Sequence, residues 1–228
     1  MSARREVGGP SMSDLPLFPL HTVLFPGMML PLHVFEERYK RMISACLDDD
    51  RRFGVVLIRS GEEVGGGAEP HDVGTIARIT GVGRLEEGRM NLLTVGEERF
   101  RIVRLSQQEP YLVGEVERIS DVHEHVFDLE EPADRVSALF AEYYRLTTLM
   151  RGGWQRAINL PRDADRLAYL VAAQLQAPAA VKQSLLEMTS LRKRLEREVH
   201  LLGVAIPTLT ELLQSARRQR HTGFGVLN

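Results

Sequence analysis

The chain has few of the residues on which several classes of site depend. Its 228 residues include one cysteine, Cys46, and three lysines, Lys40, Lys182 and Lys193. A single cysteine cannot form an internal disulfide or supply the ligand pattern of a structural zinc site. Basic and acidic residues nearly balance, 29 against 31, for a formal net charge of −2. The charge of the whole chain therefore gives no attraction toward nucleic acid or anionic membranes.

The chain also has no long, uninterrupted apolar run. Residues 15–35 carry no formal charge, but four prolines and one glycine divide them: Pro16, Pro19, Pro26, Gly27 and Pro31. A membrane-spanning helix needs about 20 consecutive, mostly apolar residues, and each internal proline removes a helix hydrogen bond. The same prolines break the apolar part of a signal peptide. We therefore expect a soluble, cytoplasmic protein that does not bind membranes.

Familiar catalytic motifs are absent from the sequence. It contains no G-x-x-x-x-G-K-[ST] phosphate loop, no G-x-S-x-G elbow and no H-E-x-x-H metal pair. The remaining candidates for metal binding or nucleophilic chemistry are three close pairs: His123 with His125, Lys40 with Ser44, and Ser190 with Lys193. We interpret all six as ordinary surface residues, because a catalytic lysine must be desolvated and a metal site needs a third ligand.

The periodicity of apolar residues changes once along the chain. Within residues 14–122, short apolar runs and turns predict five or six strands, with one early helix at 33–47 and a hairpin turn at Glu86–Gly88. From 123 to 215 the period is helical. Residues 1–13 and 216–228 are expected to be flexible tails, the second of them basic. The fold class is thus α+β, a strongly bent β domain followed by a helical bundle.

Helix boundaries within the second half follow from capping residues. We expect helices at 132–150 and 163–176, and a third helical region from Pro178 in which Thr189 and Ser190 interrupt and restart the helix. Gly203 predicts a helix end. A capping box that begins at Thr208 predicts the start of a last helix.

An apolar turn in the first half is the candidate binding site. Flexible methionines on an exposed apolar surface suit the binding of varied peptides, and not every side chain at a turn can face one core. We predict peptide binding by Leu24, Phe25, Met28, Met29 and Leu30. Packing of these residues in a crevice between the β domain and the early helix is the alternative, and the sequence leaves it open.

Several ordered motifs resemble the N-terminal domain of Lon ATP-dependent proteases. They are two leucine-proline-leucine strands, a phenylalanine-proline-glycine turn and a VGTIA strand, found here at Leu15–Leu17, Leu30–Leu32, Phe25–Gly27 and Val73–Ala77. The segment VKQSLLEMTSLRKRLEREVHLL is also similar to Lon. The resemblance covers residues 14–206 and implies a PUA-like β domain followed by a helical bundle.

The resemblance also implies a function. Full-length Lon continues into an ATPase and a Ser–Lys protease, and this sequence ends before either, so the chain looks like a stand-alone Lon-domain protein of the peptidase S16 family. We predict a non-enzymatic protein- or peptide-binding module, an adaptor or holdase in protein quality control. It would have no catalytic residue, no metal ion and no cofactor. Its expected partners are unfolded or specific protein substrates, and Lon itself or a second copy of the chain is left open.

Two other functions remain as alternatives. PUA-like domains elsewhere recognise RNA, but the near-neutral charge and the small number of aromatic residues, five tyrosines and one tryptophan among them, argue against nucleic acid as a partner. A hydrolase built on Lys40 and Ser44, or on the histidine pair, is the third hypothesis.

Overall fold

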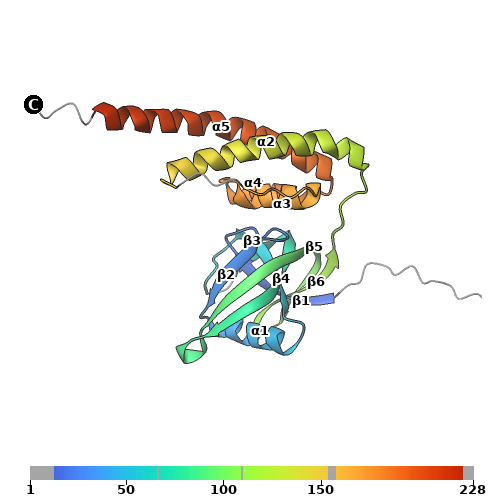
Figure 1. Cartoon of the computed structure of the whole chain (residues 1–228). Coiled ribbons are helices and arrows are strands. Elements are labelled where there is room, and N and C mark those ends of the chain that lie inside the picture. The colour runs from blue at the N-terminus through green and yellow to red at the C-terminus, as the bar shows by residue number, and fades with distance from the viewer. Residues whose placement is uncertain (1–12, 66, 109, 154–157, 223–228) are drawn as a thin grey trace, which may run out of the picture. The chain divides into compact units, whose positions relative to one another are not determined.

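The computed structural model describes residues 13–65, 67–108, 110–153 and 158–222 (Figure 1). Of the predicted tails, residues 1–12 and 223–228 lie outside the described residues. Six strands and one helix come first: β1 (Ser13–Leu20), β2 (Met29–Val34), α1 (Glu37–Asp48), β3 (Arg52–Ser60), β4 (Glu69–Arg84), β5 (Met90–Gln108) and β6 (Tyr111–Arg118). Four helices follow: α2 (Val126–Met150), α3 (Ala164–Gln174), α4 (Ala179–Glu187) and α5 (Leu191–Thr222). The α+β class predicted from the sequence is confirmed.

The six strands form one sheet in the order β2-β5-β4-β3-β1-β6. β1 and β3 pair in parallel, and the other neighbours pair antiparallel. The first half of β5 pairs with β2 and the second half with β6, so the sheet closes into a ring (Figure 1). Among the described residues β2 pairs with β5 alone. β2 is therefore an edge strand.

Two glycines allow backbones to approach closely inside this ring. A Cβ atom on Gly74 of β4 would lie 2.4 Å from the carbonyl oxygen of Val55. A Cβ atom on Gly96 of β5 would lie 2.3 Å from the carbonyl oxygen of Phe25. Any other residue at these positions would push the segments apart.

Helix α1 packs on the sheet through one face. Tyr39, Met42, Ile43 and Cys46 recur at helical spacing and are buried, and the ring of Phe18 stacks on that of Tyr39 with centroids 4.0 Å apart. The early helix predicted from the sequence is confirmed, although it begins later because β2 continues to Val34. A second buried cluster fills the ring itself: Leu15, Leu17, Val56, Ile76, Phe100 and Val116.

The turn after α1 holds a residue other than glycine in the left-handed region. Arg51 has a φ of 66°, and its N–H donates to the carbonyl oxygen of Cys46 at 2.8 Å, which ends the helix. We expect Arg51→Gly to raise the free energy of unfolding by about 0.5 kcal/mol, because relief of left-handed strain exceeds the entropy lost by glycine. Arg41→Gly, on the exposed helical face of α1, should lower it by about 1 kcal/mol. Urea unfolding measures both, and equal losses in the two variants would contradict the prediction.

Helix α4 packs with the sheet although it lies far along the chain. The side-chain amide of Gln183 donates to the carbonyl oxygen of Val73 on β4 at 3.0 Å. The guanidinium of Arg99, on β5, donates to the carbonyl oxygens of Leu186 at 2.8 Å and Met188 at 2.7 Å. These carbonyls lie at the carboxyl end of α4, where the helix supplies no further N–H groups to donate to them. The sheet thus contacts the middle of α4 through the carbonyl of Val73 and the end of α4 through the side chain of Arg99.

The described chain divides into two compact units. The first contains residues 13–121 and Ala172–Thr189, which include the sheet, α1 and α4. The second contains Val122–Val171 and residues 190–222, in which α2 and α5 pack against each other (Figure 1). Its buried apolar residues on these two helices include Val136, Phe140, Tyr143, Leu146, Leu195 and Leu202.

Helix α5 is one continuous helix, so the predicted end at Gly203 and new start at Thr208 are wrong. Pro207 lies inside the helix. Proline has no N–H to donate to the carbonyl of residue 203, and its ring crowds that carbonyl. Glycine at position 203 gives the backbone freedom to tilt the carbonyl away. The glycine and the proline therefore compensate each other instead of marking a break.

Candidate functional site

The candidate turn lies between β1 and β2. The N–H of Met28 donates to the carbonyl oxygen of Phe25 at 3.0 Å. Pro26 follows Phe25, and Gly27 has a φ of 77°, the residue pattern of a type II turn. The turn is also bonded to the middle of β5, since Gly27 N–H donates to the Gly96 carbonyl at 2.8 Å and Gly96 N–H to the Met28 carbonyl at 2.9 Å. The Pro26–Gly27 pair and these hydrogen bonds to β5 thus hold the turn rigid.

The structure separates the five residues of the predicted peptide-binding turn. Leu24, Phe25 and Leu30 are buried, and Met28 is partly buried against the core of α1 and the sheet. Met29 is exposed. A buried side chain cannot touch a ligand without local unfolding, so only the two methionines are accessible to one. Peptide binding at the turn stays a prediction.

An exposed apolar surface continues from the turn along β2 and β5, and we call it the β2–β5 face. Met29 is 64% exposed, Phe35 48% and Leu93 42%. Pro31 lies directly opposite Leu93 in the strand pairing, two residues from Met29 and therefore on the same side of β2. The ring of His33 stacks near that of Phe35, with centroids 5.9 Å apart. Apolar side chains gathered on an edge strand are typical of an interaction surface.

The sequence analysis did not select Pro31, Phe35 or Leu93. The alternation in the segment MLPLHV, Met29–Val34, was the available signal, since buried Leu30 and Val34 alternate with exposed Met29, Pro31 and His33. Leu93 has no local signal of this kind. Its exposure depends on the pairing of β5 with β2, which is a long-range contact.

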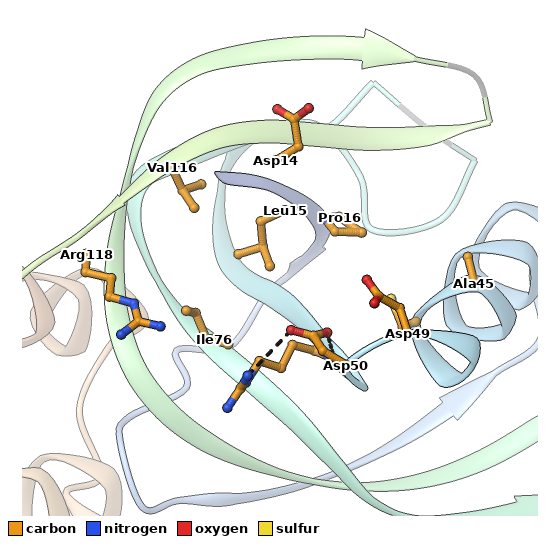
Figure 2. A pocket seen from close by; sticks show the side chains of 11 residues that line it. Asp14, Leu15, Pro16, Ala45, Asp49, Asp50, Ile76, Val116 and Arg118 are labelled. Carbon is orange, nitrogen blue, oxygen red and sulfur yellow. Dashed lines mark hydrogen bonds and ion pairs between the residues drawn. The ribbon is translucent and has the colours of Figure 1, made fainter. Parts of the chain in front are cut away.

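A pocket of about 350 Å³ lies at the end of α1, and we call it the α1-end pocket (Figure 2). Leu15, Ile76 and Val116 line it with the outer ends of buried apolar side chains. Asp14, from β1, and Asp49, from the end of α1, lie at different sides of it, and the carboxylate of Asp49 points toward its centre (Figure 2). The pocket thus combines an apolar floor with an acidic rim.

Two arginines also line the α1-end pocket, and each has a carboxylate partner. Arg52 Nε lies 2.7 Å from Glu97, and its Nη1 lies 3.5 Å from Asp50. Arg118 Nε lies 3.1 Å from Glu98. Their charges are therefore balanced by neighbouring groups.

The thiol of Cys46 also lines this pocket. Burial raises the pKa of Cys46 to about 11, and the charges of Asp50 and Asp49 act in the same direction. A thiol with this pKa is protonated near neutral pH, whereas the nucleophile in cysteine chemistry is the thiolate. The arrangement indicates a packed structural cysteine.

The first of the lysine–serine pairs makes main-chain contacts. Ser44 Oγ donates to the carbonyl oxygen of Lys40 at 2.8 Å, and Lys40 Nζ donates to the carbonyl oxygen of Glu87 at 2.8 Å. His123 and His125 are exposed. In the part of the chain that the structure describes, no three histidine, cysteine, aspartate or glutamate side chains form a cluster suited to a metal ion.

The second pair belongs to a helix cap. Ser190 Oγ donates to Glu124 at 2.7 Å and accepts the N–H of Lys193 at 3.2 Å, so this serine caps α5 as predicted. The sequence analysis did not single out Lys182. Burial lowers the pKa of Lys182, and its Nζ donates to the carbonyl oxygen of Ala173 near the end of α3 at 2.8 Å. This lysine likewise satisfies a carbonyl at a helix end.

Comparison with known proteins identifies the fold and its family. The profile of the ATP-dependent protease La (LON) substrate-binding domain matches residues 14–203. The chain belongs to the Lon substrate-binding domain family. A crystal structure of a Lon N-terminal domain protein from Xanthomonas campestris is 29% identical, with a TM-score of 0.61 over 81% of this chain and 96% of that one. The N-terminal domain of Mycobacterium avium complex Lon protease, 19% identical with a TM-score of 0.62, shows the same fold.

Curated Lon proteases are similar over most of this chain. Lon protease 2 of Herpetosiphon aurantiacus is 33% identical over 207 residues, which are 90% of this chain and 25% of that protein. Lon protease of Escherichia coli is 28% identical over 210 residues, 91% of this chain and 26% of that protein. The chain therefore spans about a quarter of the length of these Lon proteases.

Among the described residues, none of the helices combines the length and the apolar character needed to cross a bilayer.

Proposed function

We propose that this Lon-domain chain is a non-enzymatic polypeptide-binding module that recognises exposed apolar segments through the β2–β5 face. The observation that carries the proposal is the exposure of Met29, Phe35 and Leu93 on and beside an edge strand. The same surface continues into the rigid Phe25–Met28 turn. The family's substrate-binding description supports the proposal.

The chemistry of the β2–β5 face favours an unfolded chain as its ligand. Burial of apolar surface contributes about 25 cal/mol per Å² before the costs of association are subtracted, and it is largely independent of sequence. Pro31 in the middle of β2 removes one N–H from the edge, which suits a strand that must not pair indiscriminately with other strands. Side-chain burial, and not strand addition, is therefore the proposed source of affinity.

The β2–β5 face has a direct mutational test. Met29→Ser with Leu93→Ser removes two exposed apolar side chains and should weaken binding of a reduced, alkylated and labelled unfolded protein about tenfold. Fluorescence anisotropy measures the affinity. Because both side chains are exposed, the unfolding midpoint should change little, which circular dichroism checks.

The matched control is Val204→Ser with Leu212→Ser. These residues are also exposed and apolar but lie on α5. The control should bind as tightly as the unsubstituted protein. Unchanged binding in the Met29/Leu93 variant, or an equal loss in the control, would rule out the β2–β5 face as the site.

The cellular role follows from binding without catalysis. We propose an adaptor or holdase in protein quality control, which binds unfolded or specific protein substrates and passes them on or keeps them soluble. Lon protease is a proposed recipient. The bacterial relatives and the single, buried thiol favour a reducing bacterial cytoplasm as its location. RNA is disfavoured as a ligand, since the β2–β5 face is built from uncharged side chains and RNA binding depends on cations.

A further inference from the structure

We propose that the α1-end pocket is a subsite for one arginine or lysine side chain of a bound polypeptide. This inference rests on the proposed polypeptide-binding function and gives that function a preference for basic residues. It depends on a different surface from the β2–β5 face, so the two can be tested separately.

The charges at the pocket are the first support. Asp14 and Asp49 form no ion pair within the described residues, whereas Arg52 and Arg118 both have carboxylate partners. The unbalanced charge at the rim is therefore negative. A positively charged group that enters the pocket meets the Asp49 carboxylate, which points toward its centre (Figure 2), without displacing an existing ion pair.

The local sequence of α1 is the second support. Asp48, Asp49 and Asp50 follow one another at the carboxyl end of the helix, and the last turn of α1 has no basic residue. Helix ends of this kind carry partial negative charge from free carbonyls, so acidic residues are disfavoured there and cations are favoured. Asp50 accepts the N–H of Arg52 at 3.0 Å and pairs with its guanidinium, whereas Asp48 and Asp49 are locally unfavourable at this position. A cationic partner accounts for the presence of aspartates that the stability of the helix alone disfavours.

The shape of the pocket is the third support. Its volume of about 350 Å³ lies at the lower end for ligand sites, which suits a single side chain. Arginine and lysine carry an apolar stem and a charged end. The stem fits the floor of Leu15, Ile76 and Val116, and the charged end reaches the rim at Asp49.

The test uses two labelled, unstructured peptides with blocked termini and the same apolar residues. One has a central arginine and the other has citrulline, its uncharged isostere. The full chain should bind the arginine peptide about fivefold more tightly in low salt, the scale of one or two partly exposed charge contacts. In Asp14→Asn with Asp49→Asn this preference should disappear, while the affinity for the citrulline peptide stays the same.

Two further variants exclude indirect effects. Asp128→Asn with Asp134→Asn makes the same change of net charge on exposed positions of α2 and should keep the fivefold preference. Ala45→Arg, at an exposed position of α1 that lines the pocket, places a basic side chain there from the chain itself. It should abolish the preference without loss of helical circular dichroism.

The outcomes separate the subsite from the proposed function. Equal binding of both peptides by the unsubstituted chain, a preference that survives Asp14→Asn with Asp49→Asn, or tighter binding of a central-glutamate peptide would overturn the subsite alone. If neither peptide nor the unfolded protein binds, the proposed function fails and the subsite fails with it.

Discussion

Arg99→Met should lower the free energy of unfolding by about 3 kcal/mol, because one buried side chain binds two carbonyls and a carboxylate. The side chain of Arg99 is 2% exposed. It donates to the carbonyl oxygens of Leu186 and Met188 and forms an ion pair with Asp121. Methionine fills similar space but removes the hydrogen bonds that Arg99 donates to the two carbonyls and its ion pair with Asp121.

The loss should be concentrated at α4. In Arg99→Met, amide hydrogen exchange of residues 181–187 should rise well before that of β3 and β4, because α4 has lost the side chain that binds its end. Urea unfolding gives the global value. Arg101→Met is the matched control, since Arg101 is exposed and only two residues along β5, and it should change stability by less than about 0.5 kcal/mol. Equal effects of the two substitutions would contradict the assigned role of Arg99.

Glu198→Leu should stabilise the chain at pH 8 by about 2 kcal/mol, since a buried carboxyl group without hydrogen bonds must either carry a charge or hold a proton that the unfolded chain has released, and both are costly. Glu198 is fully buried on α5, and neither carboxylate oxygen has a hydrogen-bond partner among the described residues. Arg194, one turn earlier, lies 3.2 Å from Asp165 and over the ring of Tyr169. Burial raises the pKa of Glu198 well above its ordinary value, and the charge of Arg194 opposes this only in part.

The sign of the pH dependence follows from this raised pKa. The folded protein holds the proton of Glu198 at pH values where the unfolded chain has released it, so stability from this group is complete below about pH 4.5 and is lost as pH rises through the folded pKa. The stability difference between Glu198→Leu and the unsubstituted protein should therefore grow from pH 5 to pH 8. Urea unfolding at both values measures it. Glu211→Leu, at an exposed position of α5, should show no such growth, and a Glu198→Leu variant less stable than the unsubstituted protein at pH 8 would contradict the account.

Local patterns in the sequence were sufficient for much of the fold. The spacing of Tyr39, Met42, Ile43 and Cys46 predicted α1, and the Glu86–Gly88 turn joins β4 to β5 as expected. Both features depend on residues close together in the chain. Gly203 was misleading because it lies four residues before Pro207 within one continuous helix, where glycine relieves the crowding that proline causes.

Long-range contacts explain what the sequence did not reveal. Gly96 lies within one long strand, β5, because the carbonyl of Phe25 approaches there and leaves no space for a side chain. The burial of Phe25 and the exposure of Leu93 likewise depend on which strands pair. No local pattern in the sequence indicates that Arg99 binds the carbonyl of Leu186 at the end of α4, 87 residues further along the chain.

The central claim is that this Lon-domain chain binds unfolded polypeptide through apolar contacts. The most direct measurement is the fluorescence anisotropy of a labelled, permanently unfolded protein titrated with the chain at low and moderate salt, with a labelled RNA in parallel. The account predicts saturable binding of the unfolded protein that survives moderate salt, and no comparable binding of RNA. Binding of RNA alone, with an affinity that falls steeply as salt rises, would contradict it.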